Sequence, residues 1–105
     1  MTDSQNLYDV VIIGGGPAGL SAAQYASRAK LKTIILDKSA SAGALAYSSL
    51  IENYPGLENP VTGKELLDIF RKQAVRFGAE YIEAQVIGVK LDSETKEVFT
   101  LTDTY

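Results

Sequence analysis

A run of four apolar residues that ends at a glycine cluster constrains the fold of this chain more than any other feature. The run occupies positions 10–13, and three spaced glycines follow it: Gly14, Gly16 and Gly19. Uninterrupted β-branched residues are typical of a strand buried on both faces of a parallel sheet, so we expect a central strand here. In the G-x-G-x-x-G spacing, the first glycine allows a tight turn, the second lets a pyrophosphate approach the backbone, and the third lets a helix pack closely on the strand. The pattern therefore predicts a strand–turn–helix unit that binds a nucleotide diphosphate.

The residues after the glycines support this prediction. Pro17 stands where a first-turn proline costs nothing, because its missing N–H would be unpaired in any case, and small residues continue the helix. A second apolar strand is expected over residues 32–37, and it ends at Asp37, 18 residues after Gly19. This spacing is close to the ~20 residues that separate the glycines from the acid in the motif. A carboxylate at this spacing accepts hydrogen bonds from ribose hydroxyls. The alternative is an ordinary strand-to-helix turn in which Asp37 caps the end of a strand.

Composition narrows the range of functions. The chain has 105 residues, enough for one small domain with a modest core, and a formal net charge of −3 without a basic patch, so nucleic acid is not an expected partner. No apolar stretch approaches the ~18–20 residues of a membrane span, and residues 1–6 are too polar for a signal peptide, so we expect no membrane association and a cytoplasmic location. Cysteine and histidine are both absent, so no catalytic or metal-ligating residue is predicted. Any catalysis must come from a bound cofactor or from residues outside this chain.

Residues 39–60 form a long connection after the second strand. A loop longer than ~12–15 residues in a small domain is usually functional or disordered. We expect part of it to be helical and packed, because it contains several apolar residues: Ala44, Leu45, Ala46, Tyr47 and Leu50. Three tyrosines are expected to be partly buried with their hydroxyls in water: Tyr47, Tyr54 and Tyr81.

A second helix and further strands complete the chain. Thr62 and Glu65 form a capping-box pattern that starts the helix, and Gly78 ends it. Its apolar positions are expected in the core, and its basic side chains in solvent: Arg71, Lys72 and Arg76. Further strands are expected over residues 80–84, 86–91 and 98–101, of which the first is parallel and the last two form a hairpin. The predicted fold is an α/β, Rossmann-like unit with a three-stranded parallel sheet, flanking helices and a β-hairpin.

These motifs resemble the N-terminal FAD-domain segment of the thioredoxin reductase family of flavoproteins. The glycine fingerprint occurs in many dinucleotide-binding proteins, whereas the E-N-Y-P-G stretch at residues 52–56 is much more specific. The resemblance extends from Tyr8 to about Leu101. It implies that residues 1–105 are the N-terminal part of an FAD-binding Rossmann-like domain. The NADPH domain and the C-terminal segment that closes the FAD site are absent, so we expect a truncated chain.

The resemblance also implies a set of residues that bind FAD. The phosphates would lie on the glycine loop, the ribose on Asp37, the flavin near residues 43–45 and Asn53, and the adenine at the backbone near Val86. The alternative for Asn53 is a turn-forming role, because Asn, Pro and Gly form turns wherever they cluster. The complete predicted set is Gly14, Gly15, Gly16, Pro17, Ala18, Asp37, Lys38, Gly43, Ala44, Leu45, Asn53 and Val86.

The sequence departs from the usual family pattern at two of these positions. Ala44 stands where a glutamine is common, which removes a polar side chain near the flavin. Asp37 stands where a glutamate is more usual, which keeps the carboxylate but shortens its reach.

By the same resemblance, the parent protein is a flavin-dependent oxidoreductase. FAD would receive electrons from NAD(P)H or ferredoxin and pass them to a disulfide protein or a similar acceptor. A homodimer is among the assemblies that we expect for the parent protein. This segment alone is expected to be inactive. Two alternatives stay open: a fragment of an NAD(P)-binding dehydrogenase, and a non-catalytic nucleotide-binding module that self-associates through its strand edges.

Overall fold

The computed structural model describes residues 7–39 and 50–105. Their elements are β1 (Val10–Ile13), α1 (Pro17–Arg28), β2 (Thr33–Asp37), α2 (Gly63–Arg76), β3 (Glu80–Glu83), β4 (Val86–Lys90) and β5 (Glu97–Thr100). β1, β2 and β3 form a parallel sheet in that order, and β4 and β5 form an antiparallel hairpin. This arrangement confirms the predicted α/β fold, and every strand begins and ends within one residue of its expected place.

β2, rather than β1, is the central strand of the parallel sheet. All of its residues are buried, and it pairs with β1 on one side and β3 on the other. β1 is an edge strand with half-buried residues, and the side chain of Ile13 is 56% exposed. The expectation of a central first strand is therefore wrong for the described part of the chain, because β1 has a strand neighbour there on one side alone.

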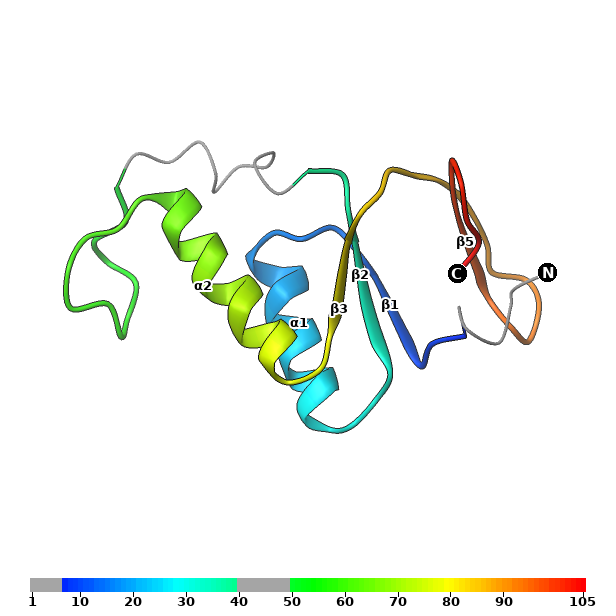
Figure 1. The fold of residues 1–105 in the computed structure, drawn as a ribbon, viewed down its shortest axis with the longest axis horizontal. Helices are drawn as coiled ribbons and strands as arrows, with labels where there is room; N and C mark the ends of the chain where they lie inside the picture. Colours follow the sequence, from blue (N-terminus) through cyan, green and yellow to red (C-terminus); the bar gives the residue numbers. More distant parts are fainter. Residues whose placement is uncertain (1–6, 40–49) are drawn as a thin grey trace.

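The sheet separates two layers of packing. α1 and α2 lie on one side of it, and the β4–β5 hairpin lies on the other (Figure 1). The helix side has its own core cluster, made of Leu20, Ala23, Ile35, Leu67, Ala74 and Ala79. The hairpin side has a second cluster, made of Ile34, Leu36, Val98 and Tyr105. Alternate residues of β2 thus point into different cores, which explains why this strand is apolar without interruption.

α2 has the predicted capping box. The Thr62 side chain accepts a hydrogen bond from the Glu65 N–H at 3.1 Å, and the Thr62 N–H donates to the Glu65 carboxylate at 3.0 Å. The helix ends before Gly78, whose φ of 111° is the left-handed conformation common after a helix. Arg71 is not on the solvent face as expected, since its side chain is 19% exposed and lies over the ring of Tyr81.

The segment before α2 is a closed loop. Ile51 and Val61 exchange backbone hydrogen bonds at 2.6 and 3.1 Å and so join its two ends. At its tip, the Leu57 N–H donates to the Tyr54 carbonyl, and Gly56 has a φ of 94°, as a proline–glycine turn requires. Most of the apolar residues that suggested a helical part in the 39–60 connection lie outside the described residues: Ala44, Leu45, Ala46 and Tyr47. Within the described ranges, no helix is long and apolar enough to cross a membrane.

Candidate functional site

The glycine loop lies at the carboxyl end of the parallel sheet, between β1 and α1. The Gly14 N–H donates to the Leu36 carbonyl at 2.9 Å, which fixes the start of the loop to β2. Gly14 has a φ of 107°, a conformation that other residues rarely adopt, so the chain turns sharply here. Gly19 packs so closely that a Cβ atom there would overlap the Gly14 carbonyl oxygen. The first and third glycines of the fingerprint therefore have the predicted turning and packing roles.

The N-terminus of α1 is open to a ligand. Gly16 is the N-cap residue, no described side chain caps the helix, and its first turn contains no acidic residue. Pro17 is in the first turn, as expected from the sequence. A Cβ atom on Gly16 would meet no atom of the described residues within 4 Å, so none of them fills the space beside the second glycine. Uncapped N–H groups and the positive end of the helix dipole make such a terminus favourable for a phosphate.

Asp37 lies beside this loop at the end of β2. Its side chain is buried, with 8% of the residue exposed, and its backbone carbonyl accepts a hydrogen bond from Ala84 at 2.8 Å. The carboxylate faces Gly15, because a Cβ atom on Gly15 would lie 2.6 Å from Asp37 Cγ. The parallel register thus brings the predicted ribose acid to the predicted phosphate loop, from positions more than 20 residues apart.

Tyr81 is a site residue that the sequence analysis missed. Its hydroxyl donates a 2.5 Å hydrogen bond to Asp37 Oδ2, rather than pointing into water as expected. Burial and this carboxylate raise the pKa of Tyr81 from 10.0 to about 12. Arg71 lies 4.9 Å from the centre of the Tyr81 ring and forms a 2.7 Å ion pair with Asp68. The signal in the sequence was weak: a tyrosine on the next strand, with no motif around it.

The remaining predicted residues are more scattered. Lys38 is exposed directly after Asp37, and Asn53 is exposed in the closed loop. Val86 opens β4 and packs against the hairpin-side core cluster. Gly43, Ala44 and Leu45 lie outside the described residues.

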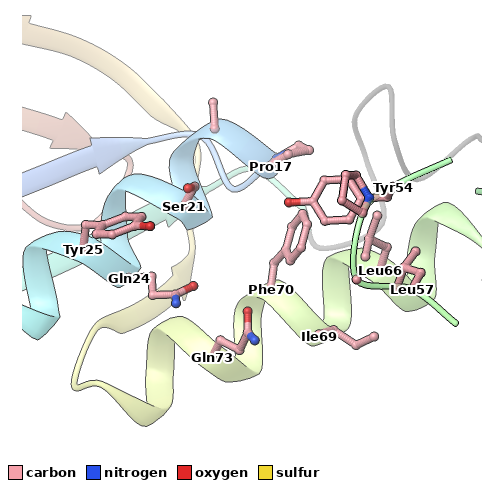
Figure 2. A pocket seen from close by; sticks show the side chains of 13 residues that line it. Pro17, Ser21, Gln24, Tyr25, Tyr54, Leu57, Leu66, Ile69, Phe70 and Gln73 are labelled. Atoms are coloured by element: carbon pink, nitrogen blue, oxygen red, sulfur yellow. The ribbon is translucent and has the colours of Figure 1, made fainter.

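A cleft of about 630 Å³ lies between α1, α2 and the turn of residues 54–57. Pro17 and Ala18 of α1 and the turn of residues 54–57 both line it, and Tyr54 lies near Pro17 (Figure 2). Tyr54 packs on Phe70 of α2, with ring centroids 5.6 Å apart. Asp37 does not line this cleft. Among the described residues, no group of three or more His, Cys, Asp or Glu side chains is placed so that it could hold a metal ion.

Comparisons with known proteins agree on one family. The sequence profile described as "Pyridine nucleotide-disulphide oxidoreductase" matches residues 8–104. A thioredoxin reductase of Aquifex aeolicus is 48% identical over 101 residues, which cover 96% of this chain and 31% of that protein. A thioredoxin reductase of Mycolicibacterium smegmatis is 43% identical over 105 residues, which cover 100% of this chain and 34% of that protein.

Solved structures give the same result. A thioredoxin reductase from Gloeobacter violaceus superposes with a TM-score of 0.91 at 49% identity, over 93% of this chain and 31% of that one. A thioredoxin reductase from Lactococcus lactis superposes with a TM-score of 0.85 at 37% identity, over 93% of this chain and 32% of that one. The chain thus spans about a third of the length of the relatives that it matches.

Proposed function

Because this chain belongs to the pyridine nucleotide-disulphide oxidoreductase family, we propose that its glycine loop and Asp37 bind the ADP half of FAD. The single observation that carries the proposal is the convergence of an uncapped helix N-terminus and a buried carboxylate at one edge of the sheet. This is the edge at which open parallel sheets bind their ligands. The residues fit the group, since no described residue fills the space beside Gly16 and the first turn of α1 contains no acid to repel a phosphate.

In this proposal, each part of the site has a distinct role. The pyrophosphate lies against the backbone of Gly14, Gly15 and Gly16 and the first turn of α1, which includes Pro17 and Ala18. Asp37 accepts hydrogen bonds from the ribose hydroxyls, and Lys38 and the backbone near Val86 border the adenosine. The flavin end lies toward Asn53 and the segment that contains Gly43, Ala44 and Leu45. The cleft supports this direction for the flavin, because it is lined both by Pro17 and Ala18 at the start of α1 and by the turn that directly follows Asn53.

The chain's contribution is to bind and orient the cofactor. Bound FAD supplies the redox chemistry, and the described residues contain no cysteine or histidine that could share in it. For the whole protein, we propose a thioredoxin reductase-like oxidoreductase that passes electrons from NAD(P)H, or from ferredoxin, to a disulfide partner. The match to the pyridine nucleotide-disulphide oxidoreductase profile favours the NAD(P)H-dependent form. The 105 residues would then be the N-terminal part of the FAD domain, inactive alone.

The first test is the visible absorbance of the purified chain, followed by titration with FAD and with NAD. We expect flavin absorbance, or an affinity for FAD that NAD does not match. Gly16→Val should abolish binding, because the added side chain fills the space that the pyrophosphate needs. Gly88→Val is the matched control, since a Cβ there has only an ordinary 3.8 Å contact with Phe99.

The two ligands separate the proposal from its main alternative. Preferential binding of NAD would favour the dehydrogenase fragment. No affinity for FAD in the wild-type chain, or equal affinity in Gly16→Val, would contradict the proposed site.

A further inference from the structure

We propose that Tyr81 is a positioning residue for the nucleotide ribose: its hydroxyl holds Asp37 Oδ2 and so turns the remaining lone pairs of the carboxylate toward the ribose hydroxyls. This inference rests on the proposed function, because it assigns a second residue to the same ribose site. The hydrogen bond joins residues 44 positions apart in the sequence, on neighbouring strands.

The parallel register explains why Tyr81 reaches this carboxylate. Tyr81 pairs with Ile35, and Asp37 follows Ile35 by two residues, so all of these side chains point to the same face of the sheet. Ile35 belongs to the helix-side core cluster, and Tyr81 packs against that cluster. The ring is thus held in the apolar layer while its hydroxyl extends along the sheet to the carboxyl edge, where Asp37 ends β2.

Asp37 is restrained from two sides. Gly15 lies directly against the carboxylate, with a distance of 2.6 Å from the position of an added Cβ to Asp37 Cγ, and the Tyr81 hydroxyl holds Oδ2. An ionised carboxylate has about four lone-pair sites, so one hydrogen bond from Tyr81 leaves acceptors for two ribose hydroxyls. An acid that is already oriented loses less conformational freedom when the ligand binds.

Tyr81 itself is fixed by its neighbours. The Arg71 guanidinium lies 4.9 Å from the ring centre, and Asp68 holds Arg71 through a 2.7 Å ion pair on α2. Asp68, Arg71 and Tyr81 therefore form a connected set that ends at the ribose acid.

The test is the preference of the 105-residue chain for ADP over 2′-deoxy-ADP, measured by titration calorimetry. Wild type should prefer ADP by about tenfold or more, as a hydrogen bond to a charged group predicts. In Tyr81→Phe, we expect this preference to fall to about threefold, because the ring remains and only the hydroxyl is lost. An unchanged or larger preference would overturn the proposal.

Tyr8→Phe is the matched control. Tyr8 also donates to a carboxylate, Glu80, at 2.7 Å, and a cation, Lys32, lies 4.6 Å from the centre of its ring, but it does not touch Asp37. A general loss of stability would lower the affinity for both nucleotides equally in either variant. The preference should change in Tyr81→Phe alone.

A double-mutant cycle separates this proposal from the one on which it rests. In an Asp37→Asn background, Tyr81→Phe should have no further effect on the preference, since the hydroxyl acts through the carboxylate. If the wild-type chain prefers ADP over 2′-deoxy-ADP by about tenfold and Tyr81→Phe has the same preference, the positioning role of Tyr81 is refuted while the ribose site is retained. A wild-type chain without affinity for ADP would refute both.

A measurement on wild type covers the case in which Tyr81→Phe does not fold. The hydroxyl proton of Tyr81, held by Asp37, should give a slowly exchanging NMR resonance that persists in the ADP complex. Its loss on ADP binding would mean that the ribose displaces Tyr81, which contradicts the proposal.

Discussion

Replacement of Gly19 by alanine tests the close contact between helix α1 and strand β1. An added Cβ would overlap the carbonyl oxygen of Gly14 and would lie 3.2 Å from Ile12 Cγ2. The carbonyl is backbone and cannot rotate away, so the helix must move off the strand. Overpacking of this kind costs about 1–3 kcal/mol, and the rigid backbone contact favours the upper end of that range.

A gain in helix propensity partly offsets this cost. Alanine is favoured over glycine inside a helix by about 1 kcal/mol. The net loss in the free energy of unfolding should therefore be about 2 kcal/mol, which lowers the melting temperature by about 8–16 °C in a domain of this size.

Gly16→Ala is the matched control, three positions earlier in the same fingerprint. Within residues 7–39 and 50–105, no atom lies within 4 Å of a Cβ at Gly16, and the Gly16 φ of −77° suits any residue. The free energy of unfolding of Gly16→Ala should stay within about 0.5 kcal/mol of wild type, as is usual for substitutions that touch neither the core nor a strained backbone position. Its affinity for FAD should fall. Thermal unfolding followed by circular dichroism measures both variants. A Gly19→Ala chain as stable as wild type would refute the close-packing argument.

Three further predictions concern the site and the helices. Gly15→Ala should weaken ADP binding in calorimetry, because the added methyl group overlaps the Asp37 carboxylate. Thr62→Ala removes the cap of α2 and should lower the free energy of unfolding by about 1 kcal/mol, measured by thermal denaturation. Burial and a carboxylate partner raise the pKa of both Tyr8 and Tyr81 from 10.0 to about 12. Because the folded pKa is the higher one, this stabilisation is present below pH 10 and is lost as the pH rises through 12. Burial also raises the pKa of Tyr105, so ultraviolet titration should show Tyr8, Tyr81 and Tyr105 as late-ionising groups.

Local patterns predicted the elements of this fold well. The capping box of Thr62 and Glu65, the glycine after α2 and the spacing of the first glycines each describe contacts within a few residues, so the sequence contains their complete signal. Asp37 was also predictable, because the length of a strand–helix–strand unit sets its spacing from the glycine loop.

Contacts between distant residues were not predictable in the same way. Tyr81 and Arg71 were assigned to water, whereas in the structure the Tyr81 hydroxyl donates to Asp37 and Arg71 lies over the Tyr81 ring. Their positions depend on the pairing of β3 with β2 and on how α2 packs across the sheet, and neither leaves a pattern in the residues around them. The edge position of β1 was missed for a related reason: an apolar strand sequence shows burial but not which neighbour supplies it.

Gly15 and Asp37 show how such distant contacts restrict even a position that the fingerprint leaves open. The G-x-G-x-x-G pattern permits any residue at its second place, yet here a side chain at Gly15 would overlap the carboxylate of Asp37. The position of the Asp37 carboxylate therefore requires a residue without a side chain at position 15, and Tyr81 fixes that carboxylate against Gly15. A larger residue at position 15 would be compatible with this site only if the acid moved away from the loop, and it would then lose its hydrogen bond to Tyr81. The ribose specificity of the proposed site thus depends on Gly15, Asp37 and Tyr81, which lie on three different elements. Of these three residues, the motif specifies Asp37 alone.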